Sequence, residues 1–486
     1  MSITTDHAAT RTRTIPATIR RQEPAGKSAH LVGICGSGMK ALAEMLSGLG
    51  WQVSGSDLSR PHPTVEALER RGMRVHFGHQ DNFLPPDVNV LVHSPAVGTD
   101  NPERQLASRL GIRQLSYSQM LGELMRERIG VSIAGTHGKS TTTAMTASIL
   151  TDAALSPSAI VGAELCGLGK SGWAGDGELF VVESCEYQRS FLDLRPKFAA
   201  ILGIEPDHFD CFPDAAQLQS AFTEFAGNVN SDGRLIVRAD CAAAKAAAAS
   251  GSARVETFGF GPGADWWGTD VRQTPWGMRF RVFRGQEFFG EFTLQLTGRH
   301  NVLNALAAVA ISSSAGAPVT AIRDSLAQFR GIKRRFEYVG SWRGMTIIDD
   351  YAHHPTAVRV SLDAARARFG GRRIWCVFQP HQVSRTSALL QEFSESFGSA
   401  DQVLIAPIFA ARENAAGAAE SMASTLAEKI AAQNVAARYS PSLDRIIATI
   451  DDEARPGDVL ITMGAGDIDR VHHEFACRLQ RNHAAG

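Results

Sequence analysis

Short apolar runs alternate with longer stretches of helical periodicity along most of the chain, and the alternation falls into three blocks. In the first block, strands are expected at 31–34, 51–54 and 88–92, and helices at 39–49 and 66–71. Strands that alternate with helices favour a parallel sheet covered by helices. Residues 30–128 are therefore predicted to form a Rossmann-like α/β domain.

The second block, residues 129–333, adds a different pattern near its end. Its expected strands lie at 129–133, 179–182 and 198–202, and its expected helices at 142–150, 218–229 and 305–311. Residues 278–296 instead place apolar side chains near every second position around a turn at 284–286, which is typical of an antiparallel hairpin. We expect an α/β domain with this hairpin added.

The third block, residues 334–486, returns to the regular alternation. Strands are expected at 345–348, 374–378, 402–405 and 459–463, and helices at 356–368, 386–397 and 421–432. This pattern predicts a second Rossmann-like domain. The whole chain is assigned to the α/β class with three domains.

Composition narrows the class of protein. The 486 residues are 44% hydrophobic and 20% charged, which describes a soluble globular protein of several domains. The net charge of −1 argues against a nucleic-acid partner, and no apolar run is long enough to insert into a membrane. The seven cysteines form no Cys-x-x-Cys pair, so we expect a cytoplasmic protein, either monomer or homodimer, without a disulfide framework or structural zinc.

Residues 1–29 form a polar segment that contains four arginines and no apolar core. A secretory signal is excluded by the missing apolar region. The Arg and Thr content is also found in transit peptides, but a disordered tail is the favoured interpretation.

The segment 135–141 carries the clearest chemistry. It reads Gly135, Thr136, His137, Gly138, Lys139, Ser140, Thr141 and lies between an expected strand and an expected helix. Glycines let backbone N–H groups face an anion, the helix N-terminus adds partial positive charge, Lys139 adds a full charge, and a hydroxyl can hold Mg²⁺. The central domain is therefore predicted to be of the P-loop ATPase type. The alternative is a helix N-cap with a chance lysine.

A second glycine turn lies at 33–39. Residues 36–41 fit the dinucleotide fingerprint, and Asp57 follows about twenty residues later. A glycine turn at a helix N-terminus binds any diphosphate, including that of a UDP-sugar. A nicotinamide enzyme, a UDP-sugar site and a purely structural turn all remain open from the residues alone.

Candidate metal ligands follow two strands of the second block. Glu183 and Glu186 come after one strand, and His208 comes after the next. Because the carboxyl ends of parallel strands share one edge with the phosphate loop, these groups and the Ser140 hydroxyl suit Mg²⁺. Taken singly, His208 is more often an ordinary loop histidine than a ligand, and the joint placement makes the two interpretations about equal.

Two further segments suit contacts with a nucleotide. Asn301 and Asn304 share one face of a helix and could bind an adenine edge, or could serve as a cap and a surface residue. Residues 349–356 combine acids, an aromatic ring and two histidines at a strand end, which suits a ribose and base or a metal.

Cations in the third block suit acidic groups of a substrate. His381 and Arg385, in the segment 378–386, could grip a carboxylate. Arg334 and Arg335 lie at the boundary between the second and third blocks, where a cation could approach a transferring phosphate or simply be solvated.

Together these segments resemble the Mur ligases, the ATP-dependent amide-forming enzymes of peptidoglycan synthesis. The resemblance runs from His30 to about Val471, and five segments match in order: 33–39, 135–143, 298–304, 349–356 and 378–386. Residues 464–468 also fit. The Gly-Thr-His-Gly-Lys loop is far more specific than a general phosphate loop.

The resemblance implies roles for individual residues in ATP binding and catalysis. Lys139 would bind the β- and γ-phosphates, Arg335 would approach the γ-phosphate, and Ser140, Glu186 and His208 would be metal ligands. His300, Asn301 and Asn304 would surround the adenine, and Asp350 and Tyr351 would hold the ribose and base.

The resemblance also implies the other two substrates. Gly33, Gly36, Ser37, Gly38, Met39 and Asp57 would line the UDP-sugar site, and His381 and Arg385 would face the amino acid and the muramoyl carboxylate. The segment 378–386 is similar to members of the family that join L-alanine to UDP-N-acetylmuramate through an acyl phosphate, using ATP and Mg²⁺. The alternatives are a relative that adds another amino acid or a peptide, and an NAD-dependent oxidoreductase.

The chain departs from the family pattern at several positions. Cys185 and Gln188 stand where the family has aspartates, and Leu202-Gly203 replaces Thr-Asn. Gln382 replaces an arginine, which removes a positive charge near the expected acceptor. The surroundings of the metal and the identity of the amino acid are the expectations that these changes affect most.

Overall fold

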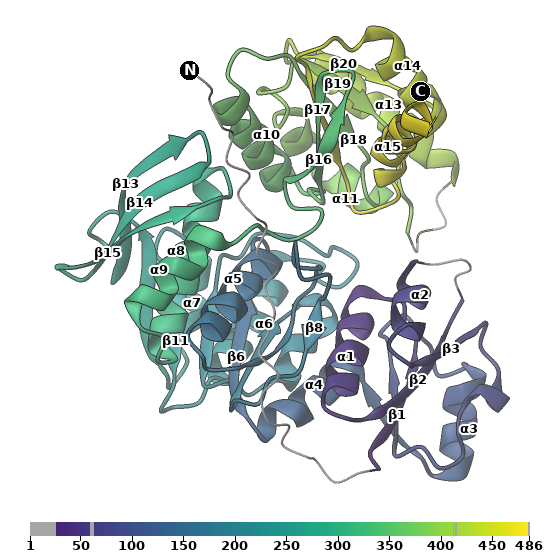
Figure 1. Ribbon diagram of the computed structural model, residues 1–486, viewed down its shortest axis with the longest axis vertical. Coiled ribbons are helices and arrows are strands. Elements are labelled where there is room, and N and C mark those ends of the chain that lie inside the picture. The colour runs from purple at the N-terminus through teal and green to yellow at the C-terminus, as the bar shows by residue number, and fades with distance from the viewer. Residues whose placement is uncertain (1–25, 59–62, 412, 414–415, 485–486) are drawn as a thin grey trace, which may run out of the picture.

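The computed structural model describes residues 26–58, 63–411, 413 and 416–484 (Figure 1). Each of the three sequence blocks contains its own β-sheet, of five, ten and six strands. In the described part of the chain, no helix is long and apolar enough to cross a membrane.

The first sheet is parallel throughout and has the strand order β3-β2-β1-β4-β5. Its strands are β1 Ser28–Val32, β2 Gln52–Asp57, β3 Arg74–Phe77, β4 Val90–His93 and β5 Arg113–Ser116. Its helices are α1 Ser37–Gly48, α2 Pro63–Glu69, η1 Asp81–Phe83, α3 Pro102–Leu110 and α4 Tyr117–Arg126. The chain reverses its winding beside β1, and a parallel sheet binds ligands beyond the strand ends at such a point.

Strand β1 begins two residues inside the segment that the sequence assigned to a disordered tail. Ser28 donates from its backbone N–H to Asn89 Oδ1 over 2.7 Å, which fixes the start of the strand. Residues 1–25 of the expected tail lie outside the described residues.

The second sheet has the order β15-β14-β13-β12-β11-β10-β6-β9-β7-β8. Its strands are β6 Ile129–Ala134, β7 Ser158–Ile160, β8 Gly172–Trp173, β9 Leu179–Glu183, β10 Phe198–Ile201, β11 Arg234–Arg238, β12 Arg254–Phe260, β13 Trp266–Thr274, β14 Gly277–Arg284 and β15 Glu287–Leu294. Its helices are α5 Lys139–Asp152, η2 Tyr187–Asp193, α6 Ala215–Gly227, α7 Ala242–Ala248, α8 Arg299–Ser314 and α9 Val319–Gln328.

The expected hairpin is confirmed as β14 and β15, but it has a third antiparallel strand, β13, that the sequence analysis missed. Exposed polar residues such as Asp270 and Arg272 fill much of β13, and a bulge interrupts its pairing between Thr269 and Arg272. The alternation of apolar and polar side chains that identifies a strand is therefore weak here.

The third sheet has the order β16-β17-β21-β18-β19-β20, with only β16 antiparallel to its neighbour. Its strands are β16 Glu337–Trp342, β17 Met345–Asp350, β18 Ile374–Phe378, β19 Gln402–Ile405, β20 Ala436–Tyr439 and β21 Val459–Met463. Its helices are α10 Pro355–Phe369, α11 Val383–Ala388, α12 Leu390–Ser394, α13 Ala416–Ala431, α14 Leu443–Glu453 and α15 Asp469–Ala484. The single helix expected over 386–397 is two helices, because Leu389 leaves helical geometry at φ −114° and ψ 22°.

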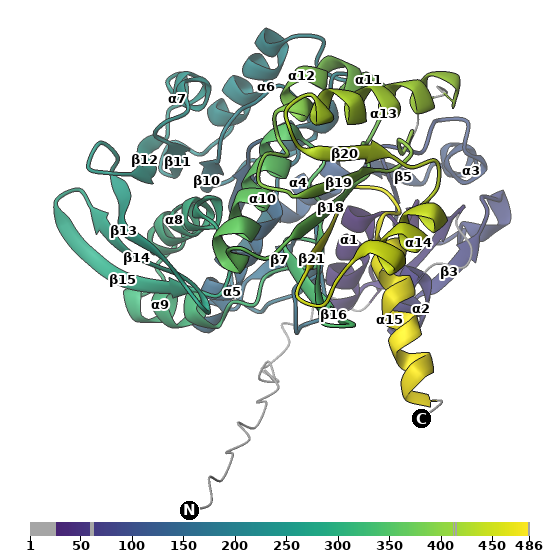
Figure 2. The same ribbon diagram turned by 90° about the horizontal axis from the view of Figure 1, so that it is seen from above.

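The first and second domains are docked through α1 and β8. Glu44 of α1 is buried and accepts hydrogen bonds from the backbone of Ser171 and Gly172. A Cβ atom at Gly172 would lie 1.8 Å from the carbonyl oxygen of Ala41, so only glycine allows this approach. Figure 2 shows α10 of the third domain beside α8 of the second, and a Cβ atom at Gly298, just before α8, would lie 3.0 Å from the Cβ atom of Ala364 in α10.

Candidate functional site

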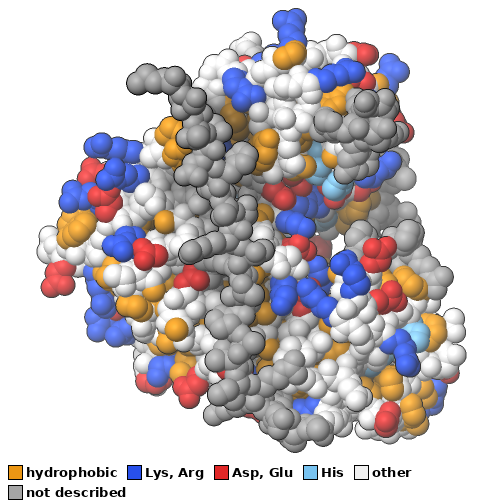
Figure 3. Space-filling model, viewed as in Figure 1, with side chains coloured by type: hydrophobic (Ala, Val, Ile, Leu, Met, Phe, Trp, Pro, Cys, Tyr) orange, Lys and Arg blue, Asp and Glu red, His pale blue; other side chains and the backbone are white. Residues whose placement is uncertain are grey.

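A cleft of about 1150 Å³ opens between the three domains and collects most of the expected site residues. The first domain contributes the glycine turn before α1, the second contributes the phosphate loop and the start of α8, and the third contributes the end of β17 and the start of α10. Figure 3 shows Lys and Arg side chains gathered around the hollow between the third domain and the other two. The two glycine turns therefore face one shared space.

The phosphate loop connects β6 to α5. Gly138 has φ +81°, and a Cβ atom there would lie 2.3 Å from Asn304 Oδ1, so both backbone and space require glycine. No side chain caps the N-terminus of α5. Its backbone N–H groups are therefore directed at the cleft, as in sites that bind phosphate.

Lys139 is held by one buried acid and by the loop itself. Its Nζ donates to the carbonyl of Gly135 over 2.6 Å and to Glu186 Oε2 over 2.9 Å, and Glu186 is only 1% exposed. Burial opposes the charge on Lys139, but Glu186 outweighs that effect and raises the pKa of the ammonium above its ordinary value. Lys139 therefore stays charged at the edge of the cleft.

The expected metal ligands fall into two neighbouring pairs. Ser140 Oγ donates to Glu183 Oε1 over 3.0 Å, whereas Glu186 accepts from Lys139. His208 Nε2 lies 3.7 Å from Glu186 Oε1. Ser140 is therefore hydrogen-bonded to Glu183, which ends β9, whereas Glu186, expected from the sequence as a metal ligand, is paired with Lys139. Both pairs lie beside the phosphate loop.

The residues expected around adenine lie at the start of α8. His300, Asn301 and Asn304 line the cleft. Asn301 donates to the carbonyl of Thr297 over 2.8 Å and accepts from Asn304 over 3.2 Å. Burial lowers the pKa of His300 to about 4, so its imidazole is neutral near pH 7.

Asp350 ends β17, Tyr351 follows it, and both line the cleft. The Asp350 carboxylate already accepts from the backbone of Ala352 and from Ser361 Oγ, so it orders the loop before α10. The guanidinium carbons of Arg334 and Arg335 lie 5.3 and 5.0 Å from the centre of the Tyr351 ring. Arg335 reaches the cleft from the segment that joins the second and third domains.

His381 and Arg385 differ from the expectation, because neither side chain lines the cleft. Arg385 is 3% exposed, and its Nη2 donates to Asp207 Oδ1 of the second domain over 2.6 Å. Burial would raise the pKa of Asp207, but His208 and Arg385 hold it below its ordinary value. Arg385 is thus one half of a buried ion pair between domains, and sequence reasoning could not see its distant partner.

On the UDP-sugar side, Gly36, Ser37, Gly38 and Met39 line the cleft, but Gly33 and Asp57 do not. Asp57 Oδ2 accepts from the backbone N–H of Cys35 over 2.8 Å, so it supports the turn. This placement weakens the case for a nicotinamide site, where the acid contacts a ribose.

Tyr117 also lines the cleft, beside the glycine turn, and sequence reasoning missed it. A Cβ atom on Gly38 would lie 2.9 Å from its ring. The capping box formed by Ser116 and Gln119 at the start of α4 positions this tyrosine and was readable in the sequence.

Sequence reasoning also missed a group that joins the phosphate loop to the third domain. Glu205 Oε2 lies 3.2 Å from His137 Nε2 and accepts from Thr356 Oγ1 over 2.7 Å. His354 Nδ1 lies 3.9 Å from the same oxygen. Burial opposes ionisation of Glu205, but hydrogen bonds from His137 and Thr356 lower its pKa to about 2.

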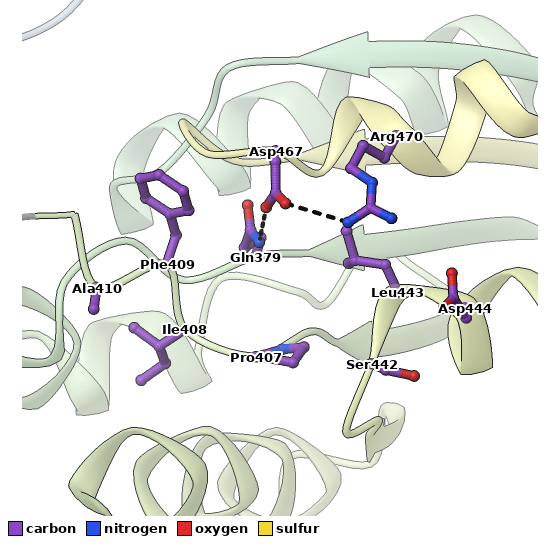
Figure 4. Close-up of a pocket in the computed structure, with 10 residues that line it drawn as sticks. All are labelled: Gln379, Pro407, Ile408, Phe409, Ala410, Ser442, Leu443, Asp444, Asp467 and Arg470. Atoms are coloured by element: carbon purple, nitrogen blue, oxygen red, sulfur yellow. Dashed lines mark hydrogen bonds and ion pairs between the residues drawn. The ribbon is translucent and has the colours of Figure 1, made fainter. Parts of the chain in front are cut away.

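A smaller cavity of about 310 Å³ lies within the third domain, beyond the ends of β18, β19 and β21 (Figure 4). Gln379 Nε2 donates to Asp467 there over 2.9 Å, and Arg470 lies 3.7 Å from Asp467. The ring of Phe409, which lines this cavity, stacks on His381.

Models of the Mur ligase family match the chain in three consecutive stretches. They are the Mur ligase family catalytic domain over residues 28–129, the Mur ligase middle domain over 133–312, and the Mur ligase glutamate ligase domain over 334–466. The chain belongs to the Mur ligase family.

Individual relatives agree over nearly the whole length. The UDP-N-acetylmuramate–L-alanine ligase of Desulfitobacterium hafniense is 41% identical over 92% of this chain and 99% of its own. The structure of UDP-N-acetylmuramate-alanine ligase MurC from Thermotoga maritima has a TM-score of 0.80 at 25% identity, covering 94% of this chain and 100% of that chain. The murein peptide ligase mpl of Psychrobacter arcticus has a TM-score of 0.72 at 26% identity, covering 93% and 98%.

Proposed function

We propose that the protein joins L-alanine to the carboxylate of UDP-N-acetylmuramate at the expense of ATP, in the synthesis of peptidoglycan precursors. The observation that supports this most directly is the shared cleft, in which a phosphate loop and a second glycine turn face each other. The curated relatives of similar length carry this activity in their names. A cytoplasmic location follows from the proposed substrates, ATP and a UDP-sugar.

We assign the domains as 30–128 for the UDP-sugar, 129–333 for ATP and 334–486 for the amino acid and closure. ATP would place its phosphates on the N-terminus of α5 and beside Lys139, with adenine near Asn301 and Asn304. Hydroxyl and carboxylate oxygens are the ligands that Mg²⁺ prefers. Ser140 and Glu183 fit that preference, as does Glu186 beside His208. When bound, Mg²⁺ would neutralise charge on the phosphates.

The reaction must overcome two chemical obstacles, because a carboxylate is a poor electrophile and an ammonium is not a nucleophile. The muramoyl carboxylate would attack the γ-phosphate to give an acyl phosphate and ADP. Lys139 and Arg335 would stabilise the charge that spreads over the transferred phosphoryl group. The free amine of L-alanine would then attack the acyl carbon, and phosphate would leave.

Neutral imidazoles near the cleft could accept the proton that the amine loses. Burial lowers the pKa of His381 to about 4 and lowers that of His353 well below its ordinary value, so both are unprotonated at neutral pH. The third domain would exclude water from the acyl phosphate while it is docked on the second.

A single-turnover experiment with UDP-N-acetylmuramate, ATP and labelled L-alanine tests the proposal. We expect label in a UDP-linked product, with phosphate release that depends on alanine. The proposal is wrong if no divalent ion supports alanine-dependent phosphate release. Glycine, L-serine and a tripeptide acceptor in parallel reactions would separate L-alanine addition from the peptide addition named for the mpl relative.

A further inference from the structure

Three side chains outside the proposed magnesium ligands converge at the junction of the second and third domains. They are His137 of the phosphate loop, Glu205 of the loop after β10, and His354 at the N-cap of α10. One nitrogen or oxygen from each lies within 4.8 Å of the others, and within the described residues this is the one group of three or more His, Cys, Asp or Glu so arranged.

The hydrogen bonds of His354 fix which of its nitrogens is free for an ion. His354 Nε2 lies 3.3 Å from the carbonyl of Pro206, which can only accept, so Nε2 carries the proton. Nδ1 is then unprotonated and accepts weakly from the backbone N–H of Thr356 over 3.3 Å. Histidines that bind metals commonly donate their other N–H to a backbone carbonyl in this way.

Two electron-pair donors consequently face each other without a proton between them. His354 Nδ1 and Glu205 Oε2 are 3.9 Å apart. His137 Nε2 lies 3.2 Å from the same oxygen and would release its proton when a metal ion replaces that hydrogen bond. Ligands about 2.0–2.1 Å from a tetrahedral zinc ion lie about 3.3 Å from one another, so small side-chain movements suffice.

We propose that His137, Glu205 and His354 bind a late first-row transition-metal ion such as Zn²⁺. Two imidazoles and one carboxylate suit zinc, whereas Mg²⁺ prefers oxygen ligands alone. All three residues line the cleft, so a fourth ligand of the ion could come from that side. The inference goes beyond the proposed function and rests on geometry that does not require the ligase reaction.

A bound ion would connect the phosphate loop directly to the third domain. His137 and Glu205 belong to the second domain, while His354 begins α10 of the third. The ion would therefore stabilise the docked arrangement, and it would slow any turnover that requires the domains to separate.

Equilibrium dialysis of the full-length, EDTA-treated protein against Zn²⁺ in millimolar Mg²⁺ tests the site. We expect one zinc per chain in the wild type. His354→Asn and Glu205→Gln should each weaken binding at least about 100-fold, the upper end of what loss of an outer-shell partner costs in metal sites. Co²⁺ should give a visible absorption spectrum in the wild type that both variants lose.

Two matched variants identify the site and keep the test decisive. His208→Asn removes a proposed magnesium ligand, and His76→Asn removes a histidine of the first domain; both should retain zinc. Glu205→Gln preserves the side-chain shape, so it remains informative if His354→Asn does not fold. The proposal is overturned if His208→Asn loses zinc or if the wild type binds no stoichiometric zinc. It is also overturned if the Glu205 and His354 variants bind zinc as tightly as the wild type. Because no substrate is present, these results are independent of whether the protein is a ligase.

Discussion

The two glycine turns that face the cleft each lead into a helix without a side-chain cap, but they differ in the side chains around them. Helices α1 and α5 each begin directly after a glycine, and neither N-terminus has a side-chain cap. At α5, Lys139 is fixed by the buried Glu186. At α1, Lys40 turns away toward Glu164, 3.3 Å distant. Both turns therefore offer uncapped backbone N–H groups, and only the second places a lysine in the lining of the cleft.

Replacing Lys139 should have the largest effect and should separate the roles of the two turns. We expect Lys139→Ala to reduce alanine-dependent phosphate release about 1000-fold, because a cation aimed at the transferring phosphate is lost. Binding of UDP-N-acetylmuramate, measured by calorimetry, should stay within a few-fold of wild type.

Lys40→Ala is the matched control, since it removes the lysine beside the other turn. Its phosphate release should remain close to wild type. A similar loss of activity in both variants would mean that the two turns do not have separate roles. Thermal unfolding of Lys139→Ala is needed alongside, because Glu186 is left buried without its ion-pair partner.

This contrast also shows what could be predicted from the sequence. The phosphate loop was predictable because strand, glycines, lysine and helix are neighbours in the chain, and the same holds for the turn before α1. The partner of Arg385 was not, because Asp207 lies 178 positions away. Asp57 matched the fingerprint by spacing. That spacing does not show that the Asp57 carboxylate accepts a hydrogen bond from the backbone N–H of Cys35.

The metal-adjacent residues show the same limit at shorter range. Glu183 and Glu186 are three positions apart, and the sequence analysis chose Glu186 to accompany Ser140. In the structure, Glu183 is the last residue of β9 and meets Ser140, while Glu186 lies beyond the strand end and meets Lys139. The sequence placed these residues beside the phosphate loop, and the end of β9 determines which side chain each of them meets.

The second-largest effect should come from the ion pair that ties the third domain to the phosphate side of the cleft. Asp207 and Arg385 are 2.6 Å apart with side chains 7% and 4% exposed. Asp207→Asn should lower the free energy of unfolding by about 3 kcal/mol, because Arg385 is left buried without a counter-charge. Urea unfolding measures this loss.

The double variant Asp207→Asn with Arg385→Gln should recover part of that stability, since no unpaired charge remains. Binding of UDP-N-acetylmuramate to the first domain should change little in either variant. Additive losses in the double variant would contradict a direct interaction between the two side chains.

Adding one methyl group to each turn should affect a different substrate in each case. Gly138→Ala places a Cβ atom at φ +81° and 2.3 Å from Asn304 Oδ1, whereas Gly38→Ala places one 2.9 Å from the Tyr117 ring. A side chain in this left-handed backbone conformation costs about 1–2 kcal/mol, so we expect KM for ATP to rise about tenfold in Gly138→Ala.

Gly38→Ala should instead raise KM for UDP-N-acetylmuramate, and by less, because a side chain can move more easily than a strained backbone. Tyr117→Ala added to Gly38→Ala should relieve the contact and recover part of the loss. Steady-state kinetics with each substrate varied in turn measures both KM values. A rise in both KM values from either change would contradict the expectation that each turn serves one substrate.

Acidification should act on two domains, on the second through His300 and on the third through His381. Burial lowers the pKa values of His300 and His381 from 6.5 to about 4. The unfolded chain therefore binds protons at these positions before the folded protein does, so stability is complete above pH 6.5 and falls as the pH decreases toward 4. His300→Asn and His381→Asn should each flatten this part of the stability profile, measured as the urea midpoint against pH. Profiles parallel to the wild type would mean that these histidines do not connect protonation to stability.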